Sequence, residues 1–411
     1  MPLRIIVDPL PQASRVAVLR DDRLIAYFAD EGHDAAPAPG AVVVARVDRV
    51  FPGRRLIACD LGGIAASLRW QKGAMPKPGQ RLIATVAADA REDKPLQLRH
   101  GVVIEDPLMV LETAASGGLR LSRRLAATGF VAPAGLADLC TGLQLTLRQR
   151  AAGEDGEVLI TRAKTMISEA RQLEAMAEAS PGVIRTAPDA AETARLAFPE
   201  AAVCRDDDGV VWQDADIDSM ITAALSPRQL ITGGAVLHIN TPPGAAVIDG
   251  DSGSSDLPPL DLARAMVTPV AEAVLLRRIS GPVVVDFPRL EAAGQKAVHA
   301  AMELATADDP LRPQCHGFAR GGLYTMTRPW RWQPLAGLLA PTPRFQAVEA
   351  VRLARRMAAT PAAGVVTLSP EARDWITGPG AAWVDDVLKG LASLIEFRSD
   401  EGCTEPRFTR R

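Results

Sequence analysis

The sequence predicts a multidomain protein of mixed α/β and α+β class, and three observations support this prediction. With 411 residues, the chain is longer than one hydrophobic core usually serves. Over about the first hundred residues, short alternating segments are separated by Gly, Pro or Asp, which is typical of antiparallel strands. From about residue 233 onward, aliphatic runs alternate with longer segments of helical period, which is typical of an α/β layout.

The N-terminal part is predicted to form a hairpin followed by a barrel. LRIIVD and SRVAVLRDDRLIAYFAD alternate in polarity, and Asp21–Asp22 is expected at the turn of the hairpin. HDAAPAPG, at residues 33–40, is a linker of small residues. Five short strand-like runs follow between residue 41 and about residue 100, most of them separated by Gly or Pro. Five strands in so short a stretch fit an OB-type barrel, whose usual ligands are oligonucleotides.

The middle of the chain is predicted to contain one strand and two helices. LQLTLRQRAAG is predicted to be a strand, and a helix is expected from about Gly156 to Glu178. The apolar positions of this helix recur at helical spacing: Val158, Ile160, Ala163, Met166 and Ile167. Residues 180–212 are rich in Ala and Pro and poorly periodic. The second helix is expected in DADIDSMITAAL, with Asp214 or Asp216 as its N-cap.

The C-terminal half is predicted to be an α/β region followed by a small α+β domain. From residue 233 the order is strand, strand, helix, strand, helix, strand, and Pro269 should kink the first of these helices. The tail from Arg344 alternates helical segments with short strand-like ones.

Composition limits the classes of partner and site. Hydrophobic residues make up 47% and charged residues 23%, and 46 basic against 49 acidic residues give a net charge of −3. A nucleic-acid partner would therefore need a local basic patch, because the whole molecule has no attractive field for it. The five cysteines lie far apart without a CxxC pair, which indicates reduced thiols, a cytoplasmic location and no zinc site. We expect no signal peptide and no membrane span.

Two aspartates at strand ends give the strongest chemical signal. The aliphatic run in AAVIDGDSG ends at Asp249, and the run in GPVVVDFPRL ends at Asp286. Sheets with parallel strands bind ligands at this edge, and Mg²⁺ is commonly held by one or two carboxylates. Asp251 lies on the same side of its strand as Asp249 and would add a ligand or orient a water. Strand-end aspartates also act as turn formers or helix N-caps, which is the alternative.

Basic residues give a second signal. They gather in short stretches: Arg120, Arg123 and Arg124 in RLSRRL, and Arg148 and Arg150 in LQLTLRQRAAG. The guanidinium fork matches phosphate oxygens, although ordinary surface ion pairs are the alternative. Lys94 and Arg99, at the end of the predicted barrel, allow the same two interpretations. His238 and His299 have no second ligand at metal spacing and are expected to be structural.

Four segments, in order, resemble the catalytic region of the ribonuclease E/G family. They are QDADIDSMITAAL with the following GG, then VIDGDSG, LRRISGPVVVDF and GLYTMTRPW. The resemblance is strongest over residues 213–332, and the hairpin, the barrel and SGGLRLSRRL follow the family's order more weakly. It implies an Mg²⁺-dependent endoribonuclease that cleaves single-stranded RNA in RNA processing or decay.

The resemblance also implies a series of domains along the chain. They are an N-terminal hairpin belonging to a ribonuclease-H-like subdomain (1–35), an OB-fold RNA-binding barrel (36–104), a 5′-sensor region (105–180), a truncated ribonuclease-H-like remainder (181–224), a DNase-I-like catalytic subdomain (225–340) and a small C-terminal domain (341–411).

Roles for individual residues follow from the same resemblance. Asp249 and Asp286 fall on the family's two Mg²⁺-binding catalytic aspartates, and Asp251 falls on an asparagine that supports the metal. The residues expected to contact RNA or its 5′-phosphate are Arg150, Gly118, Arg123, Arg124, Lys94 and Arg328. Of these, Arg150 falls on the arginine that senses a 5′-monophosphate, and Arg328 on the arginine of an EMTR segment.

The chain also departs from the family. The threonine beside the sensing arginine is Ala151, the glutamate of the EMTR segment is Thr325, and two RNA-stacking phenylalanines are replaced by Ala58 and by Ala66 or Ser67. The CPxC zinc-link motif is absent, so no zinc is expected and any homo-oligomer would form in another way. These losses leave a second hypothesis, a catalytically degenerate relative that binds RNA or a protein partner. A third is a different Mg²⁺ phosphoesterase on the same scaffold.

Overall fold

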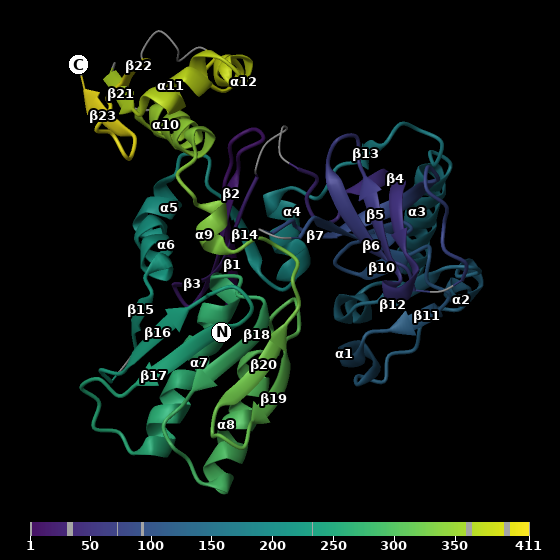
Figure 1. Ribbon diagram of the computed structural model, residues 1–411, viewed down its shortest axis with the longest axis horizontal. Coiled ribbons are helices and arrows are strands. Elements are labelled where there is room, and N and C mark those ends of the chain that lie inside the picture. Colours follow the sequence, from purple (N-terminus) through teal and green to yellow (C-terminus); the bar gives the residue numbers. More distant parts are fainter. Residues whose placement is uncertain are drawn as a thin grey trace. The chain divides into compact units, whose positions relative to one another are not determined.

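The structure is a computed structural model that describes residues 2–30, 36–71, 73–91, 94–231, 233–358, 364–389 and 395–410. It divides into two compact units (Figure 1). Unit 1 comprises Met1–His33, Ala201–Arg328 and Pro334–Arg411, and unit 2 comprises Asp34–Glu200 and Pro329–Gln333. The start of the predicted linker, residues 33–35, lies outside the described residues. Within the described ranges, no helix combines the length and the apolarity needed to cross a lipid bilayer.

Unit 2 contains the predicted five-stranded barrel. Its strands are β4 (Val42–Phe51), β5 (Leu56–Asp60), β6 (Ala65–Arg69), β7 (Arg81–Ala88) and β8 (Leu96–His100), with the short helix η1 (Pro52–Arg54) after β4. The order β4-β5-β6-β8-β7 closes through pairing of β4 with β7, and β6 runs parallel to β8. This is an OB-like barrel, and the prediction is confirmed. A further strand, β13 (Gly182–Arg185), adds to β4.

A second sheet of unit 2 packs against a long helix. Its strands are β9 (Val103–Glu105), β10 (Met109–Glu112), β11 (Gly118–Leu121) and β12 (Gln144–Leu147). The helices are α1 (Arg123–Ala126), α2 (Leu136–Leu139), η2 (Gln149–Gly153), α3 (Gly156–Glu174) and α4 (Ala190–Ala197). The predicted strand LQLTLRQRAAG therefore ends at Leu147, and the rest of it turns into η2.

Helix α3 begins where the sequence predicts and ends four residues earlier. The carboxylate of Asp155 accepts a hydrogen bond from the Glu157 amide and caps its first turn. The core face is shifted from the one expected, because Val158 is 47% exposed whereas Leu159 is fully buried. Ala163, Met166 and Ile167 are buried as expected, so the period was correct and the position of Val158 was wrong.

The first sheet of unit 1 contains the predicted hairpin. Its strands are β1 (Leu3–Asp8), β2 (Arg15–Arg20), β3 (Arg23–Ala29) and β14 (Ala202–Arg205), in the order β14-β1-β2-β3. Asp21 and Asp22 both have positive φ, as the tight turn between β2 and β3 requires. The helices α5 (Val210–Asp214) and α6 (Ile217–Leu225) follow β14. Asp216 is the N-cap residue of α6, as one of the two predicted alternatives, but its side chain makes no capping hydrogen bond, and Asp214 instead ends α5.

The second sheet of unit 1 is the α/β region. Its strands are β15 (Arg228–Leu230), β16 (Val236–Asn240), β17 (Ala246–Asp251), β18 (Gly281–Asp286), β20 (Tyr324–Arg328) and β19 (Gln314–Phe318), in that spatial order. The helices α7 (Pro259–Leu276) and α8 (Ala292–Ala305) pack on one face, where their apolar side chains form a core with the inward side chains of the strands (Figure 1). The assigned helix α7 continues through Pro269. The predicted order of elements is confirmed, with β15 and β19 as additional strands.

The C-terminal segment is α+β, as predicted. After the short helix α9 (Leu335–Leu338) come α10 (Pro343–Ala358), α11 (Pro370–Thr377) and α12 (Ala381–Val387), with a sheet of β21 (Gly364–Leu368), β22 (Ile395–Ser399) and β23 (Arg407–Arg410). The strand order is β22-β21-β23.

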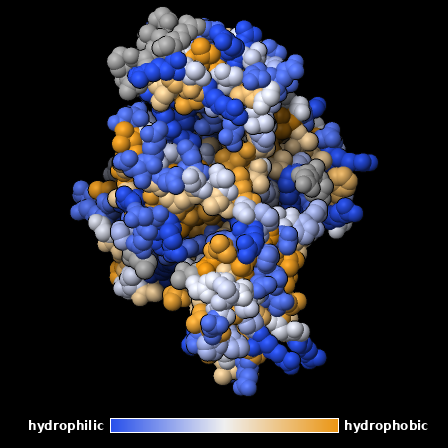
Figure 2. Space-filling model, turned by 90° about the vertical axis from the view of Figure 1, so that its left-hand side faces the viewer, coloured by the Kyte–Doolittle hydropathy of each residue, from blue (hydrophilic) through white to orange (hydrophobic). Residues whose placement is uncertain are grey.

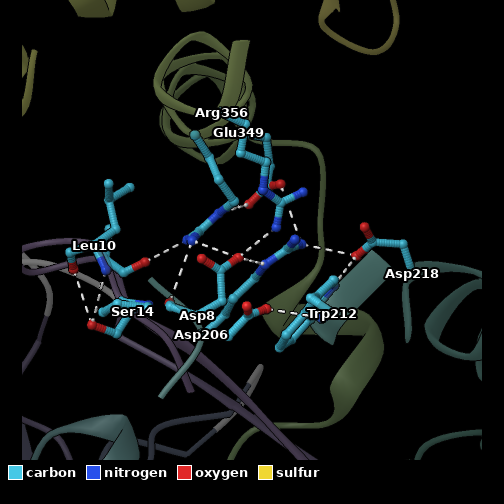
Figure 3. Close-up of polar contacts among 12 residues, drawn as sticks. Asp8, Leu10, Ser14, Asp206, Trp212, Asp218, Glu349 and Arg356 are labelled. Atoms are coloured by element: carbon cyan, nitrogen blue, oxygen red, sulfur yellow. Dashed lines mark hydrogen bonds and ion pairs between the residues drawn. The ribbon is translucent and has the colours of Figure 1, made fainter. Parts of the chain in front are cut away.

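A buried ionic network joins α10 to the first sheet of unit 1 (Figure 3). The Asp8 carboxylate, at the end of β1, binds Arg15 of β2 at 2.7 Å and, from α10, Arg352 at 3.0 Å and Arg356 at 2.8 Å. Asp218 also binds Arg15, at 2.9 Å. Burial opposes the charge of Asp8, but the three arginines outweigh it and hold the pKa of Asp8 below its ordinary value. The network is therefore ionised at neutral pH and fixes α10 on this sheet.

Candidate functional site

Asp249 and Asp286 lie side by side at the ends of two parallel strands. They are register partners in the β17–β18 pair, where Ile248 faces Val285 one step earlier. Neighbouring strands lie about 4.8 Å apart, and registered residues project to the same face of a sheet. The structure therefore brings the two carboxylates together, as the spacing of the aliphatic runs predicted.

The face that carries these aspartates is opposite the core. Ile248 and Val285 are fully buried beneath α7 and α8, whereas Asp249 and Asp286 are exposed. No hydrogen bond or ion pair engages either carboxylate among the residues that the structure describes. Figure 2 shows the molecule from the side on which β15, β16 and β17 lie in Figure 1. Hydrophobic and hydrophilic side chains are mixed on the face seen in Figure 2. The paired carboxylates are thus available to a ligand.

Gly250 permits the close approach of the two strands just beyond Asp249. A Cβ at this position would lie 3.0 Å from the Asp286 carbonyl oxygen and 2.7 Å from the Met266 sulfur. Met266 is fully buried in the core under the sheet. A side chain at residue 250 would therefore push β17 away from β18 or from α7, and the glycine keeps the two aspartates in register.

Asp251 holds the loop that follows β17. It is exposed, and alternation along β17 places it on the same face as Asp249. One of its carboxylate oxygens accepts a hydrogen bond from the Gly253 amide at 2.6 Å, which forms a local turn. On β16 its register partner is Val236. It has no register partner on β18, because that strand ends at Asp286. Asp251 therefore borders the pair with one oxygen committed to the loop.

The structure adds two nitrogen-bearing side chains that the sequence did not single out together. His238 of β16 is the register partner of Asp249, and Arg228 of β15 is the register partner of His238. Arg228, His238, Asp249 and Asp286 form a row across four neighbouring strands. We expected His238 to be structural, but it lies partly exposed in this row. Nitrogen donors and carboxylate acceptors thus share one face.

The donor set fits a hard divalent cation of the Mg²⁺ type. Within the described part of the chain, no three His, Cys, Asp or Glu side chains are grouped closely enough to form a metal site. Two adjacent carboxylates suffice for Mg²⁺, which usually keeps several waters and also binds substrate phosphate. Asp249 and Asp286 would hold such an ion, and Asp251 lies two residues beyond Asp249 on the same face of β17.

Arg328 does not lie where an RNA contact requires it. Its side chain is 1% exposed and forms a bidentate pair with Asp309, at 2.6 Å and 3.1 Å. A third nitrogen donates to the Ile279 carbonyl at 3.3 Å. The guanidinium is occupied within unit 1, and its place fits a structural role instead of the expected contact with RNA.

The expected 5′-phosphate residues of unit 2 are brought together only in part. Helix α1, with Arg123 and Arg124, contacts η2, which carries Arg150. Arg150 is exposed and donates to the Pro199 carbonyl. Gly118 lies at the other end of β11, three residues or about 10 Å before that strand ends. Its amide donates to the Leu143 carbonyl at 3.2 Å, so it is not directed at a ligand beside Arg150.

Lys94 lies in the connection between barrel strands β7 and β8. Its backbone pairs with that of Arg91, and its side chain is exposed. The loop between the fourth and fifth strands of an OB-fold is one of those that contact oligonucleotides. Lys94 is therefore presented at a position suited to a phosphate backbone.

The comparison with known families covers the middle of the chain. No curated protein matches the sequence. Residues 184–331 match the model of the Ribonuclease E/G family, and this range includes the whole sheet that carries Asp249 and Asp286. This match supports membership of the Ribonuclease E/G family over the matched residues.

Proposed function

We propose that the protein is an Mg²⁺-dependent endoribonuclease that hydrolyses phosphodiester bonds of single-stranded RNA. The family match suggests a ribonuclease. The observation that carries the finer proposal is the in-register pair of exposed, unengaged carboxylates, Asp249 and Asp286. Such a pair suits a cation that also binds the phosphate of a substrate.

In this proposal, Asp251 and the four residues of the row have different roles. Asp249 and Asp286 hold the ion, and Asp251 orients a water beside it. When bound, Mg²⁺ supplies Lewis-acid activation of the attacking water and offsets the charge that develops on the phosphate. His238 and Arg228 present nitrogen donors on the same face, where they would position a phosphate oxygen.

Substrate binding would draw on unit 2. Its OB-like barrel presents Lys94, and the α1–η2 region presents Arg123, Arg124 and Arg150. Arginine forks bind phosphates in a bidentate way, which suits the 5′-monophosphate of an RNA end. Cleavage would leave a 5′-phosphate on the downstream product.

The test is cleavage of a fluorescent, 5′-monophosphorylated oligoribonucleotide with and without Mg²⁺. We expect Asp249→Asn and Asp286→Asn to lower the rate about a hundredfold or more, because metal-assisted charge stabilisation contributes several kcal/mol. The control is Asp256→Asn, an exposed aspartate of unit 1 outside the row. Mg²⁺-dependent cleavage at the normal rate by either site variant would refute the mechanism.

The same assay separates the other two hypotheses. Binding of the oligoribonucleotide without products in Mg²⁺ would favour a degenerate RNA-binding relative. Hydrolysis of bis-(p-nitrophenyl) phosphate together with indifference to RNA would favour a different phosphoesterase. The exposed, unengaged carboxylate pair supports a metal-dependent enzyme over the degenerate relative, and the family match supports RNA over another phosphodiester as its substrate.

A further inference from the structure

A small cavity of about 60 Å³ in unit 2 is lined by three arginines and one carboxylate. Arg99 comes from β8, Arg185 from β13, and Arg331 from the segment Pro329–Gln333. The carboxylate is Glu105, the last residue of β9. Elements distant in the sequence thus direct positive charge to one place, which we call the arginine cavity.

Each arginine is held in place by a partner carboxylate. Arg99 binds Glu112 at 2.6 Å, Arg185 binds Glu169 at 2.6 Å, and Arg331 binds Glu105 at 3.1 Å. Such pairs fix the orientation of a guanidinium and still leave several of its five N–H donors unused. A ligand in the cavity would therefore meet donors that are already positioned.

Glu105 does not neutralise the cavity, because a fourth arginine shares it. Arg148 binds the second oxygen of Glu105 at 2.7 Å. Burial opposes the charge of Glu105, but Arg331 and Arg148 outweigh it and keep the pKa of Glu105 below its ordinary value. One carboxylate thus faces two arginines here, and the walls retain an excess of positive charge.

Donors at the cavity lack acceptors. The Nε of Arg331 is buried and has no hydrogen-bond partner among the described residues. Arg185 uses its Nε for Glu169, and its two terminal nitrogens have no partner in the same part of the chain. A buried donor without a partner is costly and calls for a water or an ion. We propose that the arginine cavity binds a phosphate-type oxyanion.

The volume of the arginine cavity limits the size of the ligand that it can hold. A cavity of about 60 Å³ holds roughly four waters, since one water needs about 10–15 Å³ on this measure. A single phosphate group, with five heavy atoms, is of this size, whereas pockets for drug-sized ligands measure about 300–1,000 Å³. The occupant is therefore one phosphate group, either free or part of a larger molecule that extends into solvent.

This site shares no residue with the proposed catalytic pair or with the proposed 5′-monophosphate contacts. It uses none of the residues assigned to RNA cleavage or to the 5′-monophosphate, and it stands even if the protein cleaves nothing.

The experiment is calorimetric titration of the full chain with inorganic phosphate, without Mg²⁺ and at constant ionic strength. We expect saturable binding at one site. Arg185→Gln should weaken it about tenfold or more, because it removes charged hydrogen bonds to the anion. Ala87→Leu should weaken it as strongly, because Ala87 lines the cavity and the larger side chain fills it while every arginine remains. Arg195→Gln, an equal change of charge on the exposed side of α4, should leave binding unchanged.

Repeating the titration in the presence of a 5′-hydroxyl oligoribonucleotide identifies the source of the phosphate. Weaker apparent binding means that an RNA backbone phosphate occupies the cavity, and unchanged binding means that a free anion does. Circular dichroism verifies that each variant is folded. The inference is overturned if wild type shows no saturable binding, or if folded Ala87→Leu and Arg185→Gln bind phosphate as tightly as wild type.

Discussion

Replacing Asp8 with Asn removes the central negative charge of the buried network and keeps its shape. One carboxylate oxygen, Oδ2, is within 3.0 Å of a nitrogen from each of Arg15, Arg352 and Arg356. Asp8, Arg15 and Arg352 have side chains that are 5–7% exposed, so water cannot take over the lost interactions. Two buried arginines and one largely buried arginine would lose their shared counter-charge.

Asp8→Asn is expected to lower the free energy of unfolding by about 3–5 kcal/mol, which is the usual range when one partner of a buried ion pair is removed. The gross loss is larger, since each charged hydrogen bond contributes about 1.5–3 kcal/mol. Glu349 and Asp218 offset part of it, because Glu349 binds Arg15 at 3.5 Å and Arg352 at 3.2 Å, and Asp218 binds Arg15 at 2.9 Å.

Hydrogen exchange read by mass spectrometry measures this loss where it occurs. We expect peptides from β1, β2 and α10 to lose protection by between about a hundredfold and a few thousandfold, at about 1.4 kcal/mol per factor of ten. Asp22→Asn is the matched control, because Asp22 pairs with Arg4 on the same sheet and its side chain is 83% exposed. An exposed pair contributes about 0–1 kcal/mol. Equal protection in the two variants would refute the assigned role of Asp8.

The direction in which stability changes with pH follows from the pKa of Asp8 in the folded and the unfolded state. The pKa of Asp8 is lower in the folded protein than in the unfolded chain, so the folded state binds the proton less readily. Its contribution to stability is therefore complete above the unfolded value, at about pH 4, and is lost as the pH falls through the folded-state pKa. Asp8→Asn should lack this part of the acid transition.

Two further changes test the surroundings of the site. Gly250→Ala should lower the free energy of unfolding of unit 1 by about 1–3 kcal/mol, as measured by denaturation, because the added Cβ overpacks against Met266. The same variant should cleave RNA more slowly in the oligoribonucleotide assay. Gly321→Ala is the control, because an added Cβ there meets nothing within 4 Å. Arg328→Gln should cost about 3–5 kcal/mol by leaving Asp309 buried without its partner. At a temperature where this variant is folded, its affinity for RNA should equal that of wild type, and a large loss of affinity would restore Arg328 as an RNA contact.

Local patterns were sufficient to predict the barrel and the order of the α/β elements. Each barrel strand carries its own apolar alternation, and Gly or Pro marks most of the turns between strands, so no distant information was needed. The stretch from 181 to 224 shows the limit. β13 and β14 each have four residues, and their partners β4 and β1 lie more than a hundred residues away. Such short strands become recognisable only through their pairing.

The candidate site was predictable where it depends on strand ends and not where it depends on register or burial. Asp249 and Asp286 each end an aliphatic run, which the sequence displays directly. The position of His238 beside Asp249 depends on the register set by the loop between β16 and β17, and a shift of one residue would turn it to the other face. Arg328 has the charge of an RNA contact, but its pairing with Asp309 decides its burial.

The charge pattern of the chain supports a functional interpretation of the aspartate pair. Elsewhere in unit 1, the neighbouring carboxylates Asp8 and Glu349 share two arginines, Arg15 and Arg352. Asp249 and Asp286 are neighbours on adjacent strands without any such counter-ion in the described ranges, and like charges opposite each other destabilise a sheet. In water, two charges about 4 Å apart repel by about 1 kcal/mol. Among the described residues, the pair Asp249 and Asp286 thus lacks the arginine counter-ions that Asp8 and Glu349 have. A divalent cation bound between the two carboxylates would replace their mutual repulsion with the attraction of each for the cation.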